Sequence, residues 1–188
     1  MSKNTVGFIF LGIISIAGLA LGGYNFLTAQ IFVAPEESGY KLVGIWDGLD
    51  DNLNYPPHIT SFDWLFEFEQ NSYIDLEYIS VSNNNTRITL MKQGWYRIQI
   101  SVLLYDLDVA RSYRIDILKN GTILFYLDFI VTEIGYEPSY YSVHAENYVL
   151  SDGNDYIEIN GLSTGDSFYP YTIDQKHNQL VLEFVSII

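Results

Sequence analysis

The chain has 188 residues and no cysteine, and its 23 acidic side chains outnumber nine basic ones to give a formal net charge of −14. This length suits one ordinary domain. So acidic a surface repels a phosphate backbone, and we therefore expect no nucleic-acid partner. The lack of cysteine excludes disulfides, thiolate zinc sites and cysteine nucleophiles. A hydrophobic share of 48% excludes a disordered chain, and the 16 Tyr and 11 Phe favour a β-rich fold.

Residues 1–27 are predicted to form a membrane anchor. Residues 6–27 carry no charge and are long enough to cross a hydrocarbon layer of about 30 Å as one helix. Lys3 precedes this apolar run and Glu36 follows it, so the positive-inside rule places the amino terminus in the cytoplasm. We therefore expect a single-pass protein of the cell membrane with its carboxyl-terminal part outside.

A cleaved signal peptide is the alternative for the same segment. Residues 8–17 would be its hydrophobic region, and Gly18 and Ala20 would supply the small residues before the cut. The protein would then be secreted. In both cases the rest of the chain is extracytoplasmic.

A short tether, residues 28–39, is expected to lead into one domain, residues 40–188. Within that domain apolar and polar residues alternate with a period of two, which predicts half-buried strands. The clearest run is residues 95–104. The others are residues 41–46, 64–69, 73–81, 86–90, 113–118, 122–128, 140–150, 156–160 and 180–187.

Turn residues separate these runs, and no helical period follows Leu27. Asn120-Gly121 lies between two alternating runs and predicts a hairpin, because both residues tolerate a positive φ. Eight to ten short strands with regular turns indicate an all-β antiparallel sandwich or barrel.

The order of motifs along residues 63–188 resembles the jelly-roll domains of the complement subunit q and tumour necrosis factor superfamily. Gly94-Trp95-Tyr96 opens the best strand, Asn120-Gly121 forms the hairpin, and Gly165-Asp166 precedes an aromatic final strand that contains Phe184. The resemblance implies a jelly-roll β-sandwich that is extracellular and forms a homotrimer. It also implies a single amino-terminal anchor, as in many tumour necrosis factor ligands. The chain departs from the pattern in having no collagen stalk, and no receptor-binding motif carries over.

Few residues suggest chemistry. His144 and Glu146 share one strand face but lack the further ligands of a metal site. The clusters Asp47-Asp50-Asp51 and Asp152-Asn154-Asp155 suit calcium but also suit turns. The sequence has no nucleophile elbow and no phosphate-binding loop. We therefore expect no enzyme, no cofactor and no metal site.

Two sites fit the glycosylation pattern, Asn84 and Asn120, and both fall in predicted turns. Residues 136–141 and 168–171 concentrate aromatic side chains beside proline. Such clusters suit recognition of a protein or glycan, and the alternative interpretation is that they pack the loops on the sandwich.

The expected function is that of a cell-surface binding or assembly protein, oligomeric through its jelly roll. An apolar stripe on the outside of the sandwich, such as Trp95 and Leu103, would be the oligomer contact. One alternative is a fibre or surface-layer subunit in which residues 28–33 complete a neighbour's sheet. Another is a carbohydrate-binding module, and a carbohydrate-acting enzyme ranks last.

Overall fold

The computed structural model describes residues 39–134, 140–173 and 177–186. The predicted membrane segment and nearly all of the tether lie outside these residues. The described residues fall in one compact unit. The part of the chain that the structure describes contains no helix that is long and apolar enough to span a membrane.

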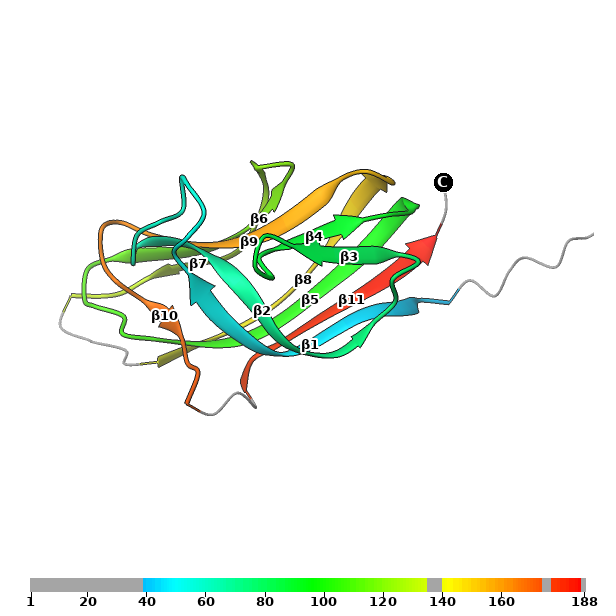
Figure 1. The fold of residues 1–188 in the computed structure, drawn as a ribbon. Helices are drawn as coiled ribbons and strands as arrows, with labels where there is room; N and C mark the ends of the chain where they lie inside the picture. Colours follow the sequence, from blue (N-terminus) through cyan, green and yellow to red (C-terminus); the bar gives the residue numbers. More distant parts are fainter. Residues whose placement is uncertain (1–38, 135–139, 174–176, 187–188) are drawn as a thin grey trace, which may run out of the picture. The chain divides into compact units, whose positions relative to one another are not determined.

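Every regular element in the described ranges that pairs with another does so antiparallel (Figure 1). The strands are β1 (Lys41–Asn52), β2 (Asp63–Ile74), β3 (Ile79–Ser82), β4 (Arg87–Leu90), β5 (Gln93–Tyr105), β6 (Ser112–Lys119), β7 (Thr122–Val131), β8 (Tyr140–Asp152), β9 (Tyr156–Ser163), β10 (Tyr169–Pro170) and β11 (Gln179–Ser186).

The strands form two layers. The first layer has the order β8-β5-β11-β1-β2, with β10 beside the end of β5. The second has the order β3-β4-β9-β6-β7. β2 joins them, because it pairs with β1 along most of its length and with β9 through residues 63–65. The hydrogen-bonded backbone is therefore one sheet folded over into a sandwich.

Alternation decides which side chains fill the space between the layers. On β5 the residues Tyr96, Ile98, Ile100, Val102 and Leu104 are all buried, as the sequence predicts. Neighbouring strands, the facing strand β6 and the loop before β10 add aromatic side chains to the same core. The largest fully buried ones are Trp46, Trp64, Phe66, Tyr113 and Phe168. Burying such side chains is the main favourable contribution to the free energy of folding.

The structure differs from the predicted strands in two places. Residues 73–81 were expected to form one strand, but the chain turns at residues 75–78, where Asp75 Oδ1 accepts a hydrogen bond from Glu77 N at 3.0 Å. This turn separates β2 from β3. The two-residue strand β10 was not expected, so the described residues hold eleven strands rather than eight to ten.

Candidate interaction surface

An unpaired strand edge lies on β7, at one end of the second layer. β7 pairs with β6 through the predicted hairpin, where Asn120 and Gly121 have φ values of 52° and 74°. Among the described residues β7 pairs with no other strand. Its free edge therefore presents backbone N–H and C=O groups that no neighbouring strand of this domain uses.

The exposed side chains of β7 are mostly apolar. Two register shifts against β6 break the strict alternation, so apolar side chains emerge on both sides of the strand. Phe129 is 59% exposed and Val131 is 64% exposed. We call the following set the β7 apolar surface: Ile123, Leu124, Phe125, Tyr126, Phe129 and Val131. Exposed apolar side chains gathered on one strand in this way are typical of an interaction site.

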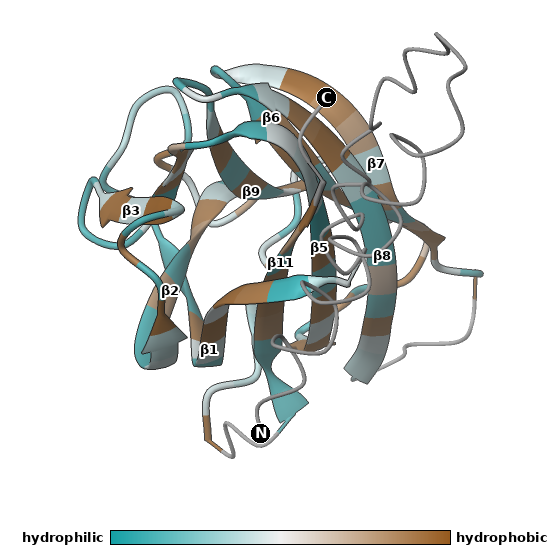
Figure 2. Ribbon diagram, turned by 90° about the vertical axis from the view of Figure 1, so that its right-hand side faces the viewer, coloured by the Kyte–Doolittle hydropathy of each residue, from teal (hydrophilic) through white to brown (hydrophobic). Residues whose placement is uncertain are grey.

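The edge of the first layer lies beside β7. Leu127 of β7 and Tyr141 of β8 both pack against the core, and β7 and β8 are neighbours in space (Figure 2). Burial raises the pKa of Tyr141, and the carboxylate of Asp128 on β7 raises it further. The two strands therefore close the sandwich on this side, with the β7 apolar surface left outside.

The first layer's outer face is polar in its middle, which corrects the expected stripe. Trp95 is 39% exposed and pairs across the strands with the exposed Leu150, but Arg97, Gln99 and Ser101 separate it from Leu103. Arg97 Nη2 lies 2.6 Å from Glu146 Oε2, and Arg97 Nη1 lies 3.1 Å from Glu183 Oε2. Trp95 and Leu103 therefore do not form a continuous apolar contact.

His144 and Glu146 do not come together as metal ligands. His144 Nδ1 lies 3.0 Å from Ser101 Oγ, whereas Glu146 binds Arg97. The hydrogen bond from Arg97, followed by that from Gln99, lowers the pKa of Glu146 to about 2. Each side chain is therefore engaged with β5 instead of with its neighbour on β8.

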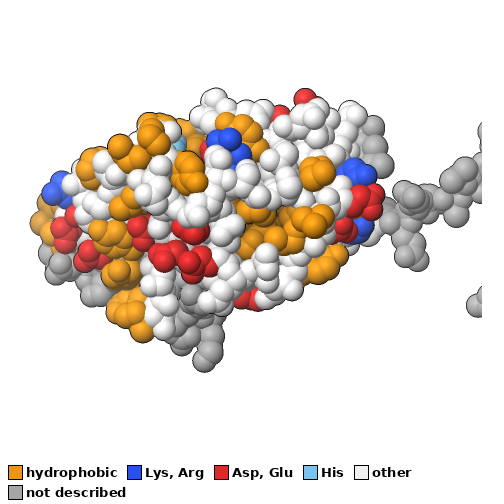
Figure 3. Space-filling model, in the orientation of Figure 1, with side chains coloured by type: hydrophobic (Ala, Val, Ile, Leu, Met, Phe, Trp, Pro, Cys, Tyr) orange, Lys and Arg blue, Asp and Glu red, His pale blue; other side chains and the backbone are white. Residues whose placement is uncertain are grey.

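Acidic side chains gather where β1 and β2 run side by side (Figure 3). Burial, and then the neighbouring Asp50, raise the pKa of Asp51 to about 6. Asp47 stands apart from this pair: it accepts hydrogen bonds from Ser72 Oγ and Gln179 Nε2, which lower its pKa. The carboxylate of Asp47 is therefore stabilised by neutral hydrogen-bond donors, whereas burial and the neighbouring Asp50 make Asp51 hold its proton more tightly.

The second acidic cluster forms a turn. Asp155 lies 2.8 Å from Lys119 Nζ and accepts hydrogen bonds from Asn120 Nδ2 and from the backbone of Asp152. Burial opposes ionisation of Asp155, but these donors outweigh it and lower the pKa. Within the described ranges no group of three His, Asp or Glu side chains is arranged to hold a metal ion.

Both glycosylation candidates lie in exposed turns, and their modification stays a prediction. Asn84 Nδ2 donates to Glu67 Oε1 at 3.1 Å. Asn120 is held from both sides, because Nδ2 donates to Asp155 at 2.6 Å and Oδ1 accepts from Tyr156 N at 3.0 Å. A glycan at Asn120 would replace one of the two Nδ2 hydrogens, of which one is needed for the bond to Asp155.

The aromatic loop at residues 168–171 packs on the sandwich. Phe168 is fully buried against Trp64 and Tyr113. Tyr171 contacts the rings of Tyr105 and Tyr140. Of the other predicted aromatic cluster, residues 136–139 lie outside the described residues.

Sequence reasoning predicted β7 as a strand but missed its exposed apolar surface. A signal was present, since residues 123–127 read Ile-Leu-Phe-Tyr-Leu, without the polar alternation of the other runs. Such a run also suits a strand buried on both faces, which is why the pattern alone does not indicate an edge.

Solved structures with a similar fold are known, although no family model and no curated protein matches the sequence. A crystal structure of murine APRIL at pH 8.5 superposes with a TM-score of 0.51 and 9% identity, covering 78% of this chain and 99% of that one. The structure of Eiger TNF from S. frugiperda gives 0.51 and 8%, covering 79% and 94%. A further murine APRIL structure, at pH 8.0, gives 0.50 and 11%, covering 75% and 98%.

The domain is a tumour-necrosis-factor-like jelly roll. At 8–11% identity the likeness is one of fold. The predicted jelly-roll sandwich is therefore confirmed for the described residues.

Proposed function

We propose that this protein is a cell-surface binding and assembly protein, held in the membrane by residues 6–27 and displaying its jelly roll outside the cell. It self-associates through the β7 apolar surface. It acts by binding and assembly and not by catalysis.

The proposed location of the domain outside the cell rests on the charge and hydropathy of the amino-terminal segment. The uncharged run 6–27 is long enough to span a bilayer, and Lys3 on its amino-terminal side favours the orientation with the domain outside. The family resemblance of the sequence supports the same orientation, because it implies a single amino-terminal anchor with the domain outside.

The β7 apolar surface is the observation that carries the assembly. Complete burial of a large apolar side chain stabilises by about 1.5–3 kcal/mol, and six such side chains are exposed on this one strand. The strand edge beside them offers unpaired backbone groups for the same contact. A homotrimer is the assembly that the family resemblance implies.

Light scattering of the full chain in a mild detergent tests this function. We expect a mass of three chains after subtraction of the detergent, and a monomer at micromolar concentration contradicts the proposal. Mass spectrometry of the native amino terminus tests the anchor separately. An intact residue 1–27 segment supports membrane display, and a cut near Ala20 indicates secretion.

A fibre subunit is the second candidate, and the open edge of β7 favours it. An extended segment from another chain could add to that edge as a further strand. Residues 31–33, Ile-Phe-Val, are apolar enough to serve. Deleting residues 28–33 separates the candidates, because strand addition predicts loss of assembly and the β7 contact predicts that assembly persists.

A further inference from the structure

A cleft of about 430 Å³ lies over the second layer, on the face turned away from the core. Ile157 and Ile159 of β9 point into the core, so Glu158 and Asn160 lie on the opposite face. Arg114 of β6 and Arg87 of β4 lie beside them, and the loop that contains Tyr55 and His58 forms one wall. The cleft volume is within the range of small-molecule sites in proteins.

The charges in this cleft occur as pairs. Arg87 Nε and Nη2 lie 2.9 Å and 2.8 Å from Glu158 Oε1, and the guanidinium stacks 3.8 Å from the centre of the Tyr156 ring. Arg114 Nε lies 2.8 Å from the buried carboxylate of Asp116.

A third pair lies at the wall of the cleft. His58 Nδ1 lies 2.6 Å from Asp63 Oδ1, and Asn160 Nδ2 donates to the same oxygen at 2.9 Å. Each basic side chain thus already has an acidic partner. The pairing also fixes the orientation of these charged side chains.

Several polar atoms remain without a partner among the described residues. Both bonds from Arg87 go to Glu158 Oε1, which leaves Glu158 Oε2 as an acceptor. Asn160 turns its Nδ2 toward three carbonyl or carboxylate oxygens, so its Oδ1 points away from them. Arg114 holds Asp116 through Nε and keeps both Nη groups as donors. The cleft therefore offers fixed donors and fixed acceptors together.

Apolar side chains complete the lining. Leu65, Leu118, Leu162 and Ile123 line the cleft, as do the rings of Tyr55 and Tyr156. Apolar and aromatic surfaces of this kind suit the C–H faces of a sugar ring.

We propose that this cleft binds a neutral sugar, as a monosaccharide unit of a glycan. Adjacent hydroxyl groups both donate and accept, so they match Arg114 Nη, Glu158 Oε2 and Asn160 Oδ1 at once. An anion would meet the carboxylates of Glu158 and Asp63, and a cation would meet the guanidinium groups of Arg87 and Arg114, so groups of both signs in the cleft disfavour a charged ligand. The cleft borders the proposed self-association surface, because Ile123 belongs to both and Arg114 lies over the Tyr126 ring, 4.5 Å from its centre.

Titration of the full chain with methyl hexosides tests the proposal. The probes are the methyl glycosides of glucose, galactose and mannose, with methyl glucuronide as the charged counterpart, in a detergent without a sugar headgroup. For so small a ligand we expect Kd on the order of 1 mM for at least one neutral probe. No neutral binding up to 50-fold that concentration, on the order of 50 mM, overturns the proposal, and so does tenfold tighter binding of the glucuronide.

Methyl NMR spectra locate the site without any substitution. We expect the signals of Leu65, Leu118, Leu162 and Ile123 to shift on titration, and the signal of Leu103 on the first layer to stay. Shifts confined to other parts of the chain overturn the assignment to this cleft.

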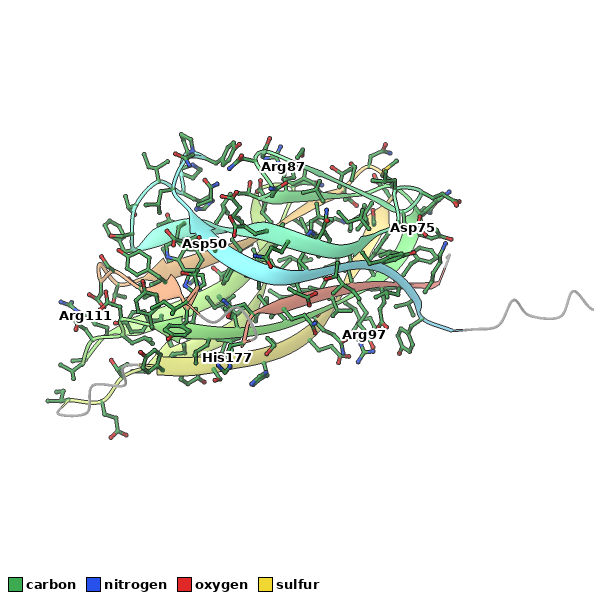
Figure 4. All side chains as sticks on the ribbon, turned by 60° about the horizontal axis from the view of Figure 1, so that its bottom comes forward. Asp50, Asp75, Arg87, Arg97, Arg111 and His177 are labelled. Carbon is green, nitrogen blue, oxygen red and sulfur yellow. The ribbon has the colours of Figure 1, made fainter. Side chains whose placement is uncertain are left out.

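A matched pair of double variants provides the second readout. Arg114→Gln with Asp116→Asn removes one ion pair at the cleft and keeps its shape. Arg97→Gln with Glu146→Gln does the same on the opposite side of the domain, where Figure 4 shows Arg97 far from Arg87. We expect the cleft variant to weaken binding at least tenfold and the control to leave it unchanged. Equal binding by both variants contradicts the proposal. Because Arg114 lies over the Tyr126 ring, the light-scattering mass of each variant is measured as well, and weaker binding by a cleft variant of unchanged mass supports the cleft.

Discussion

Gly161 on β9 lies directly opposite Trp64 on β2, so close that a Cβ atom at Gly161 would stand 2.5 Å from Trp64 Cζ2. This pair sits where β2 crosses from one layer to the other. The fully buried indole fills the space that a side chain at Gly161 would occupy.

Replacing Gly161 by alanine is expected to lower the free energy of unfolding by about 1–3 kcal/mol, because the buried indole has no room to move. Urea denaturation of the full chain, followed by tryptophan fluorescence, measures this. Trp64→Phe removes the ring atoms in question, so Gly161→Ala should cost less in that background. Equal costs in the two backgrounds would show that the indole is not the cause.

Stability should depend on Asp51 between about pH 4 and pH 6. Its pKa is about 6 in the folded protein against the ordinary value of 3.8, so the folded state holds the proton more tightly. The contribution is fully present below pH 3.8 and is lost as the pH rises through 6. Asp51→Asn should therefore be more stable than the natural chain at pH 7, by about 1–3 kcal/mol, and equally stable near pH 3.

Asp47→Asn is the control for this pH dependence. Hydrogen bonds from Ser72 and Gln179 lower the Asp47 pKa, so its stabilising contribution is present above pH 3.8 and is lost as the pH falls below that value. Denaturation curves across pH 3–8 should thus give opposite signs for the two variants. The same sign for both would contradict the assignment of these shifts.

Asn120 should stabilise the hairpin through its side chain as well as its conformation. Asn120→Ala removes the bonds to Asp155 and to Tyr156 N, and we expect a loss of about 1–3 kcal/mol. Asn84→Ala is the matched control, because Asn84 has nearly the same φ of 51° against 52° but its side chain makes one exposed hydrogen bond, to Glu67. If the two variants melt alike, the bonds at Asn120 contribute nothing.

Local patterns were sufficient for most of the fold. The alternation in residues 95–104 predicted which side of β5 is buried, and Asn120-Gly121 predicted the β6–β7 hairpin. Both depend on backbone geometry and burial within a few residues of chain. The run 73–81 failed because Asp75 caps a turn with its own side chain, and the surrounding apolar residues concealed it.

The functional surfaces depend on contacts that sequence spacing does not reveal. Phe129 is 59% exposed on the last strand of the second layer in the described part of the domain, and its spacing in the sequence reveals neither that strand order nor what covers the strand's face. The sugar cleft requires Arg87, Arg114 and His58, which come from three separate segments. The pairing of β9 with β2, β4 and β6 brings these segments together.

Charge placed on β7 tests the central claim most directly. Phe129→Glu with Val131→Lys changes two side chains of the β7 apolar surface without altering net charge, and Ile59→Glu with Leu76→Lys makes the same change at exposed positions elsewhere. Light scattering of the full chain at one micromolar concentration should give a monomer for the first variant, and the undiminished oligomer for the second and for the natural chain. An oligomer that survives on the β7 variant, or a natural chain that is monomeric, would contradict assembly through this surface.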